Sequence, residues 1–377
     1  MKIAIAYDYM AQMGGGERVV KALHKIFPKA PIYTVIYVPE EMSDEFCNME
    51  IHTSFVDRLP LSHKKFEIYI PLYAFAMEQF DFRQYDVVLS VSTMVSKGIV
   101  TGPRTCHISY CFTPMRWAWD LYHDYIGELK KAHFTRWAFR FWTHYYRIWD
   151  IASVTRVNYF LAGSKIAKRR IRKHYNRDAE VIYPPIDTQF FKVNGDQPED
   201  FYLVVSRLVF AKRIDIVVEA FAKSTRKLIV IGKGEQLSHL KNIATQNIEF
   251  LGYQQDEVVR DYYCRCRALI FPGEEDFGLT PIEAQACGRP VIAYAAGGSL
   301  ETVIEGETGI FFHNQNPEDL NNAISRFEHF DFDSDRIRLN AQRFDFETFE
   351  KRIRLLVESK YQEYQEIFND SEIDLID

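Results

Sequence analysis

Residues 271–303 read FPGEEDFGLTPIEAQACGRPVIAYAAGGSLETV, and this stretch decides the fold. Two apolar runs, Ala268–Phe271 and Pro290–Tyr294, have the length and composition of short buried strands. Between them lie an acidic loop and a segment, Ile282–Cys287, that we expect to be helical. A strand, a loop, a helix and a strand in this order predict an α/β unit, in which ligands bind at the carboxyl ends of parallel strands.

Two glutamates of this stretch, Glu275 and Glu283, stand eight positions apart. Carboxylates accept hydrogen bonds from the hydroxyl groups of sugar and ribose rings. The backbone N–H groups at a helix start have no partner within the helix and suit a phosphate. The first hypothesis from this segment is therefore a nucleotide-sugar site.

Strands and helices alternate in both halves of the chain. The expected strands of the first half are Lys2–Tyr7, Ile32–Tyr37, Val87–Val91 and His107–Cys111. Those of the second half are Tyr202–Val205, Leu228–Ile231, Ile248–Leu251, Ala268–Phe271 and Val291–Tyr294. Helical patterns such as Glu17–Ile26 and Ile214–Ala222 separate them. The alternation predicts parallel sheets covered on both faces.

The length of 377 residues indicates two domains rather than one core. Pro184 and Pro185, followed by the polar stretch 194–200, are typical of a hinge. We place a first domain at 1–190 and a second at 191–350. Residues 351–377 are expected to form a helix and an acidic tail that packs back toward the first domain.

Composition excludes several classes of protein. The net charge of −6 argues against general binding of polyanions, and we expect no nucleic-acid partner. Six cysteines without a CxxC pair are typical of free thiols in a reducing cytosol. The first residues, MKIAIAYDY, resemble a strand and not a signal peptide, and the chain lacks an apolar run of about 18 residues that would span a membrane.

Two cations follow the first strand of the second half. Arg207 and Lys212 leave the strand end where a ligand would bind, and together they would neutralise a diphosphate. A solvated basic turn is the alternative. The Glu275–Glu283 segment, at the end of a later strand of the same half, favours diphosphate binding by the two cations.

Glycine-containing turns follow three other strands. The turn at Gly232 and Gly234 brings backbone near a ligand or only connects a strand to a helix. Gly252 and Tyr253 end another strand, where they would wall a nucleotide base or simply turn the chain. Near the N-terminus, Gly14–Gly16 opens a helix, but the GxGxxG spacing of a dinucleotide site is absent.

The segment YCFTPMRWAWD at 110–120 ends a strand of the first half. We assign acceptor binding to four of its residues: Phe112, Thr113, Arg116 and Trp117. Trp117 and Trp119 stack on sugar rings or belong to the core, and both readings stay open. Arg116 and Asp120 form an ion pair or contact the substrate.

Residues 128–173 combine twelve Lys and Arg with only two acids. Aromatic residues are interleaved, and five of them fall on one face of a helix: Phe134, Trp137, Phe141, Tyr145 and Trp149. This pattern favours an interfacial helix on anionic lipid. The alternative is an amphipathic helix packed on its own domain.

Taken together, these segments resemble the retaining glycosyltransferases of family 4, which have the GT-B architecture of two Rossmann-like domains facing a cleft. The likeness spans nearly the whole chain and rests on three segments: GGGERVV, SRLVFAKRIDIVVEAF and the 271–303 stretch. The segments YCFTPMRWAWD and VSTMVSKGI are similar to a branch of bacterial polysaccharide enzymes, such as those of lipopolysaccharide synthesis, that often use GDP-mannose.

The resemblance implies a role for each matching residue. Arg207 and Lys212 would bind the diphosphate as it leaves, and with Glu275, which would contact the transferred sugar, they are the expected catalytic residues. Glu283 would hold the ribose. The remaining expected donor contacts are Gly15, Gly16, Gly252, Tyr253, Phe277, Gly278, Leu279 and Thr280.

The resemblance also implies the reaction. We expect a hexose, best assigned as mannose from GDP-mannose, to pass to a lipid-linked glycan in cell-surface polysaccharide synthesis. The enzyme would be cytoplasmic, peripheral on the inner face of the membrane, bound to anionic lipid through 128–173. No metal or cofactor is expected, because Asp331-Phe332-Asp333 follows the last expected strand, away from the site.

One position departs from the family. The family commonly has histidine where this chain has Phe112, which has no proton to exchange. This departure keeps open a binding subunit of a polysaccharide assembly complex without catalysis. A nicotinamide-dependent oxidoreductase is a further alternative, but it needs a GxGxxG turn paired with an acid about 20 residues on.

Overall fold

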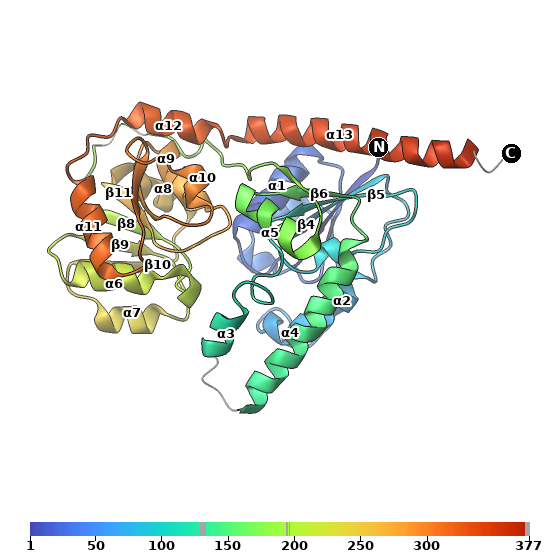
Figure 1. The fold of residues 1–377 in the computed structure, drawn as a ribbon, viewed down its shortest axis with the longest axis horizontal. Coiled ribbons are helices and arrows are strands. Elements are labelled where there is room, and N and C mark those ends of the chain that lie inside the picture. The colour runs from blue at the N-terminus through green and yellow to red at the C-terminus, as the bar shows by residue number, and fades with distance from the viewer. Residues whose placement is uncertain (129–132, 194, 196, 374–377) are drawn as a thin grey trace. The chain divides into compact units, whose positions relative to one another are not determined.

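The structure is a computed structural model that describes residues 1–128, 133–193, 195 and 197–373 (Figure 1), without the side chains of residues 128, 133, 134 and 368–373. The basic residues Lys130 and Lys131, the side chain of Phe134 and the end of the acidic tail therefore lie outside the described part. The chain forms two compact units. Unit 1 comprises Met1–Tyr183 and Phe349–Asp377, and unit 2 comprises Pro184–Thr348.

Unit 1 is built on a parallel sheet of seven strands in the order β3-β2-β1-β4-β5-β6-β7. Its strands are β1 (Ile3–Tyr7), β2 (Ile32–Thr34), β3 (Ile51–Thr53), β4 (Val87–Ser92), β5 (Cys106–Cys111), β6 (Tyr159–Ala162) and β7 (Glu180–Val181). Its helices are α1 (Gly15–Ile26), α2 (Ile70–Met77), α3 (Tyr122–Glu128), α4 (His133–Val154) and α5 (Lys165–Tyr175). Short 3₁₀ turns connect them, among them η4 (Phe66–Tyr69) and η5 (Ser96–Gly98).

Unit 2 repeats this plan with six parallel strands in the order β10-β9-β8-β11-β12-β13. Its strands are β8 (Tyr202–Val205), β9 (Leu228–Ile231), β10 (Ile248–Gly252), β11 (Ala268–Phe271), β12 (Val291–Tyr294) and β13 (Gly309–Phe312). Its helices are α6 (Ile214–Ala222), α7 (Leu237–Ile243), α8 (Asp256–Arg265), α9 (Leu279–Ala286), α10 (Ser299–Thr302), α11 (Pro317–Phe327) and α12 (Ser334–Gln342). The 3₁₀ turn η6 (Phe210–Lys212) precedes α6.

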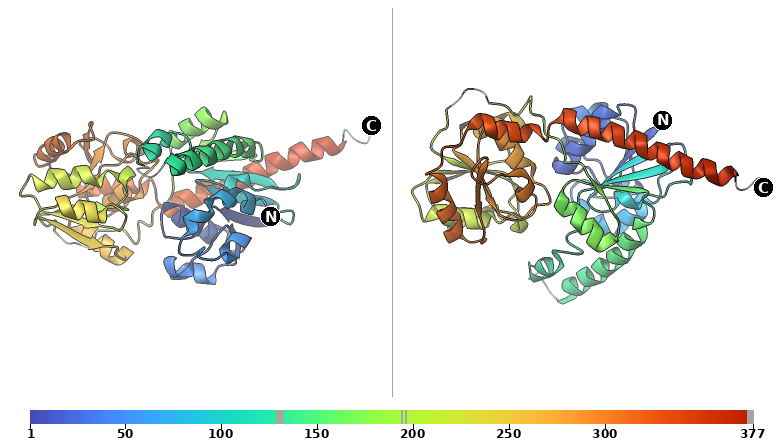
Figure 2. Two further views of the ribbon diagram at one scale, coloured as in Figure 1. Left: turned by 90° about the horizontal axis from the view of Figure 1, so that it is seen from below. Right: turned by 45° about the horizontal axis from the view of Figure 1, so that its top comes forward.

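The central strands are buried because both faces of each sheet are covered by helices (Figure 2). Every residue of β1, β4, β5 and β11 is buried. Side chains cap the starts of α5 and α11: Ser164 Oγ accepts the N–H of Ala167 at 3.0 Å, and Asn316 Oδ1 accepts that of Asp319 at 2.8 Å. Each unit is therefore a doubly wound α/β fold, as the alternation in the sequence predicted.

The last helix, α13 (Phe346–Ile373), follows unit 2 in the chain, and its residues from Phe349 onward belong to unit 1. Arg354 donates to the carbonyl of Ile26 at 2.9 Å, and the Tyr364 hydroxyl donates to that of Pro103 at 2.7 Å. These contacts attach the helix to α1 and to the loop before β5.

Some details differ from the sequence expectations. The predicted strand Ile32–Tyr37 ends at Thr34, because the Val35 N–H bonds to the carbonyl of Asp8 and the chain turns there. The strands β3, β6, β7 and β13 were not predicted. They are two to four residues long.

His107, on β5, is fully buried and bonds within unit 1. Its Nδ1 lies 3.0 Å from the carbonyl oxygen of Arg156 and its Nε2 lies 2.8 Å from Ser90 Oγ. A carbonyl only accepts, so Nδ1 carries the proton and Nε2 accepts from the serine. Burial lowers the pKa of His107 to about 4, because the charged ring would lose its water.

We predict that His107 makes unit 1 sensitive to acid. Above pH 6.5 both folded and unfolded states are neutral at this position, and the full stability is present. As the pH falls from about 6.5 to about 4, only the unfolded state gains the proton, and about 3 kcal/mol is lost. Urea unfolding at several pH values should show a shallower pH slope for His107→Gln, while the exposed His52→Gln keeps the wild-type slope. Equal slopes for all three proteins would contradict this assignment.

Candidate functional site

The candidate site of unit 2 lies where its sheet changes direction. From β8 the chain runs outward through β9 and β10, then crosses back to β11 on the other side of β8. The loops after β8 and β11 therefore leave adjacent strands at the carboxyl ends of the sheet, which is where open α/β sheets bind ligands. The first loop carries Arg207 and Lys212, and the second carries Glu275.

The two loops meet through an ion pair. Lys212 Nζ lies 2.5 Å from Glu275 Oε1, and the side chains are 18% and 26% exposed. Arg207 lies on the same loop as Lys212, and its side chain is exposed. The structure thus brings together a cation and a carboxylate from the two strands that flank the crossover, with a second cation on the loop.

Close backbone packing fixes the position of the Glu275 loop. A Cβ on Gly298 would lie 2.3 Å from the backbone of Phe277, and one on Gly297 would lie 2.3 Å from the carbonyl oxygen of Glu275. That same carbonyl accepts the N–H of Gly298 at 2.8 Å. The two glycines after β12 are needed because only a residue without a side chain lets the loops approach so closely.

Helix α9 starts directly after this loop. Gly278 precedes it with φ +86°, a conformation that favours glycine, and Leu279 and Thr280 form its first turn. The ring of Phe277 is buried against Phe344, with ring centroids 5.5 Å apart. The first-turn N–H groups of α9 therefore stand at the crossover beside the ion pair, where their partial positive charge suits an anion.

Glu283 lies one turn further along α9 and is 3% exposed. Its Oε2 accepts a hydrogen bond from the Tyr263 hydroxyl of α8 at 3.0 Å. The carboxylate expected to hold a ribose is thus buried and is fixed by Tyr263, which was not among the predicted site residues.

Two further loops lie on the other side of Arg207. The Gly232 N–H donates to the carbonyl of Gly252 at 2.8 Å, which joins the ends of β9 and β10. Tyr253 is 55% exposed, with Lys233 Nζ 5.3 Å from its ring centroid. A flat ring at this edge is able to stack on a base, so the sequence assignment of Gly252 and Tyr253 is sterically feasible.

Gln315, after β13, links the site loops and was missed by sequence reasoning. Its Nε2 donates to the carbonyl of Pro272 at 2.9 Å, and its Oε1 accepts from Arg213 at 3.3 Å. One side chain therefore ties the loop that carries Lys212 to the loop that carries Glu275. A single glutamine in a polar connection has no signal that a sequence pattern would reveal.

The glycine turn of unit 1 has a packing explanation. A Cβ on Gly16 would lie 2.1 Å from the hydroxyl of Tyr7, and that hydroxyl donates to Glu17 at 2.9 Å. Gly16 thus allows α1 to pack on β1. Gly15 is the first residue of α1. Both belong to unit 1, whereas the other expected donor contacts belong to unit 2.

The expected acceptor residues follow β5 in unit 1. Thr113 is 7% exposed, and its buried Oγ1 has no hydrogen-bond partner among the residues that the structure describes. Phe112 packs edge-on against Tyr110, with centroids 5.3 Å apart. Trp117 packs against Tyr146 of α4 at 5.3 Å. Arg116 lies in the turn between Thr113 and Trp117 and is partly buried.

Asp120 ends the same loop and bonds Arg170 and His174 of α5, at 2.9 and 3.0 Å. Its carboxylate is thereby engaged by a neighbouring helix. The ion pair that the sequence suggested between Asp120 and Arg116 is therefore not what holds this carboxylate.

The Asp331-Phe332-Asp333 segment is a helix cap. Asp333 Oδ1 accepts the N–H groups of Asp335 and Arg336, at 2.9 and 3.4 Å, at the start of α12. Within the described residues, no group of three or more His, Cys, Asp and Glu side chains is arranged to hold a metal ion.

Helix α4 carries an exposed aromatic face. Trp137, Phe141 and Tyr145 are 63%, 55% and 39% exposed and lie four residues apart, so they form one stripe. Trp149 does not continue this stripe, contrary to the sequence expectation: it is 8% exposed, and its Nε1 donates to Glu78 at 2.9 Å. No helix in the described part of the chain is both long and apolar enough to cross a bilayer.

Comparison with known proteins identifies both domains. Residues 13–190 match the family described as Glycosyltransferase Family 4, and residues 185–344 match Glycosyl transferases group 1. The chain is therefore built from the two domains of a group 1/family 4 glycosyltransferase with the GT-B fold.

Similar proteins carry related names. The O-antigen chain mannosyltransferase RfbU of Salmonella typhimurium is 27% identical over 57% of this chain and 64% of its own length. An uncharacterized glycosyltransferase of Methanocaldococcus jannaschii is 30% identical over 46% of this chain and 50% of its own length. The chain spans about half the length of most of the curated relatives it matches.

A solved structure supports the same fold. The Anabaena protein HepE in complex with UDP superposes with a TM-score of 0.68 at 18% identity, covering 95% of this chain and all of that one.

We predict that the Tyr263–Glu283 hydrogen bond stabilises unit 2. Tyr263→Phe removes the donor from a buried carboxylate and should cost about 2 kcal/mol of unfolding free energy. Tyr262→Phe, a partly buried neighbour on the same helix, is the matched control and should change little. Thermal and urea unfolding measure both, and an equal loss in the two variants would show that the hydrogen bond has no special role.

Proposed function

We propose that the protein is a hexosyltransferase that uses a nucleoside diphosphate sugar. The observation that carries this proposal is the Lys212–Glu275 pair beside the start of α9, at the crossover between β8 and β11. A cation and a helix start suit a diphosphate, and a carboxylate 2.5 Å away suits the hydroxyls of the attached sugar. The match of both domains to glycosyltransferase families supports the same reaction class.

The role of the two cations is to stabilise the diphosphate as it leaves. When the bond from the anomeric carbon to the phosphate oxygen breaks, negative charge grows on that oxygen. Arg207 and Lys212 and the first-turn N–H groups of α9 stabilise this charge without a metal ion. Phe277, Gly278, Leu279 and Thr280 supply that backbone, and the expected contacts of Gly15 and Gly16 belong to unit 1.

The carboxylates orient the donor. Glu275 accepts hydrogen bonds from the hydroxyls of the transferred hexose, and its pairing with Lys212 holds it beside the phosphate. Glu283 holds the ribose, and the Tyr263 hydroxyl fixes the carboxylate that does so. Gly252 and Tyr253 wall the base, with the exposed Tyr253 ring as the stacking surface.

Retention of configuration follows the same-face route of the family. The acceptor hydroxyl attacks the anomeric carbon on the face from which the diphosphate departs. Its proton passes to an oxygen of the leaving phosphate, so no protein base is required. Phe112, which has no titratable group, is compatible with this route.

The donor is best assigned as GDP-mannose. The likeness to an O-antigen chain mannosyltransferase supports mannose, and the HepE complex shows that a protein of this fold binds UDP. Both GDP-mannose and UDP-glucose therefore belong in the first assay.

The acceptor is best assigned as a lipid-linked glycan of a cell-surface polysaccharide, bound by Phe112, Thr113, Arg116 and Trp117. Trp117 supports this because its ring, beside Tyr146, is only partly buried and sits in the loop that follows β5. A binding subunit without catalysis is the second candidate, and Phe112 is the observation that favours it.

A lipid-linked acceptor requires the enzyme to reach a membrane, and two helices of unit 1 support this part of the proposal. The exposed stripe of α4, with Ile148 59% exposed on the same side, presents apolar surface, and Arg140 beside it is exposed. The exposed basic residues of α5 in the same unit are Lys165, Arg169, Arg172 and Lys173. Aromatic and basic side chains together suit an anionic bilayer surface, and this supports a peripheral position on the inner face of the membrane.

We predict that Lys212→Ala and Glu275→Ala each lower the transfer rate by a factor on the order of 10²–10³, because each removes stabilisation at the reacting bond. Transfer from labelled GDP-mannose and UDP-glucose is the measurement. Lys227→Ala is the matched control, since this exposed lysine directly precedes β9. It therefore lies at the amino ends of the strands, away from the carboxyl ends where the site is. Wild-type turnover in either site variant would refute the assignment, and nucleotide binding without turnover in the wild type would favour the binding subunit.

We predict that the α4 stripe carries membrane binding. The double variant Trp137→Ser/Phe141→Ser should weaken binding to vesicles of 30% phosphatidylglycerol on the order of tenfold, because each ring loses apolar burial. Leu339→Ser, an exposed apolar residue of unit 2, is the control. Binding of wild type should weaken as salt rises. Absence of wild-type binding at low salt would end this proposal.

A further inference from the structure

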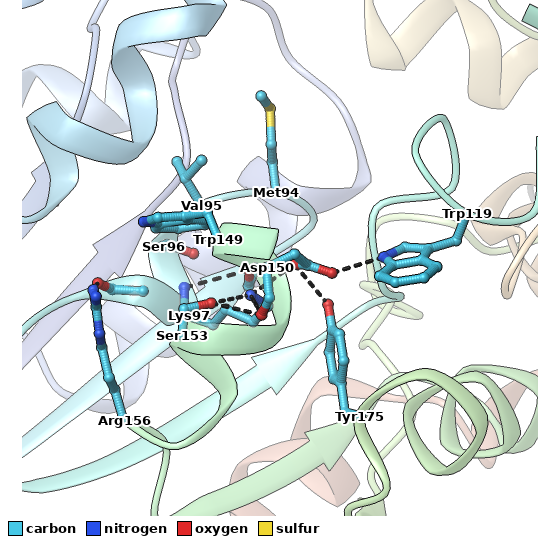
Figure 3. A network of polar contacts seen from close by, with 12 residues as sticks. Met94, Val95, Ser96, Lys97, Trp119, Trp149, Asp150, Ser153, Arg156 and Tyr175 are labelled. Atoms are coloured by element: carbon cyan, nitrogen blue, oxygen red, sulfur yellow. Dashed lines mark hydrogen bonds and ion pairs between the residues drawn. The ribbon is translucent and has the colours of Figure 1, made fainter. Parts of the chain in front are cut away.

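A buried ion pair lies behind the loop assigned to the acceptor. Lys97 of η5 and Asp150 of α4 are 1% and 0% exposed, with Nζ 2.7 Å from Oδ1 (Figure 3). The lysine also donates to the backbone carbonyl of Asp150 at 3.1 Å and to Ser153 Oγ at 2.5 Å. All three N–H bonds of the ammonium group therefore have acceptors.

Both oxygens of the Asp150 carboxylate are occupied, and they bind different parts of unit 1. Oδ1 accepts from the Tyr175 hydroxyl of α5 at 3.0 Å in addition to Lys97. Oδ2 accepts from Trp119 Nε1 at 2.8 Å. Figure 3 shows the tyrosine and the tryptophan approaching the carboxylate from different elements. One carboxylate thus connects η5, α4, α5 and the loop after β5.

Stability alone does not account for such a pair. Removing two charges from water costs as much as their attraction returns, and apolar side chains of similar volume often replace buried pairs without loss. The pair instead orients the Asp150 carboxylate, because its geometry leaves Oδ2 facing the indole N–H of Trp119.

The Trp119 side chain anchors an irregular loop. Residues 112–121 form turns between β5 and α3 and include all four residues assigned to the acceptor. On the α4 side, Arg147 Nε donates to the carbonyl of Ala118 at 2.6 Å. The bond from Trp119 to Asp150 is the link from this loop to the buried pair, two residues beyond Trp117.

We propose that Asp150, held by Lys97, is a positioning residue that fixes the 112–121 loop for acceptor binding through Trp119. The inference rests on the proposed function, because it takes this loop as the acceptor contact. It also gives α4 two roles: its outer face carries the aromatic stripe, and its inner face holds the acceptor loop.

Two variants test the proposal, since each removes one hydrogen bond from the same carboxylate. Trp119→Phe removes the bond to the loop, and Tyr175→Phe removes the bond to α5 and is the matched control. Asp150→Ala is unsuitable because it would leave Lys97 buried without a counter-charge. The measurements are transfer from GDP-mannose to decyl α-mannoside and amide hydrogen exchange of residues 112–121.

Trp119→Phe should raise the KM for decyl α-mannoside roughly tenfold and speed exchange of the loop by a similar factor, because a hydrogen bond to a charged group is lost. Its KM for GDP-mannose should stay within about twofold of wild type, because the lost hydrogen bond lies in the acceptor loop. Tyr175→Phe should change neither the acceptor KM nor loop exchange. An unchanged acceptor KM and exchange in Trp119→Phe, or equal changes in both variants, would overturn the proposal.

Failure of the proposed function would look different. In that case the wild type transfers no mannose, and the exchange rates of the loop still decide the structural part of the inference. Faster exchange in Trp119→Phe alone supports loop positioning, and equal exchange in all three proteins overturns it.

Discussion

The crossover between β8 and β11 is the constraint on which the candidate site depends. Because β9 and β10 lie on one side of β8 and β11 on the other, the loops that carry Lys212 and Glu275 leave adjacent strands and meet at one edge. Gly298 then fixes the second loop by backbone contact, so the carboxylate is positioned by the chain path and not by its own rotamer alone. The start of α9 at the same place adds the N–H groups that an anion needs.

Unit 1 has the same crossover, between β1 and β4, and uses it differently. There the carboxylate of Asp8, which is fully buried, accepts the backbone N–H groups of Thr93, Met94, Val95 and Ser96 at 2.6–2.8 Å, together with the Thr93 hydroxyl. The protein's own anion thus occupies the edge that in unit 2 presents cations and a helix start. In unit 1 an internal carboxylate therefore fills the crossover. In unit 2 the equivalent crossover is suited to an external anion.

The sequence predicted what apolar runs and turn residues determine. The strands at 202–205, 228–231 and 268–271 lie where their β-branched runs indicated, and the Glu275 loop follows the strand that was expected to precede it. Three contributors had no local signal: Tyr263 reaches Glu283 from another helix, Gln315 joins two loops, and Asp150 acts within a helix selected for its aromatic residues. Such roles arise from packing between distant segments. The prediction for α4 was wrong at Trp149, which was expected on the aromatic face but turns inward to Glu78.

The most direct test of the account is to locate the diphosphate on the protein. A crystal structure with GDP or UDP would show which side chains bind the two phosphates. We expect phosphate oxygens within hydrogen-bonding distance of Lys212, Arg207 and the first N–H groups of α9, with the Lys212–Glu275 pair at the sugar end. A nucleotide bound elsewhere, with that ion pair unchanged and remote from it, would contradict the account.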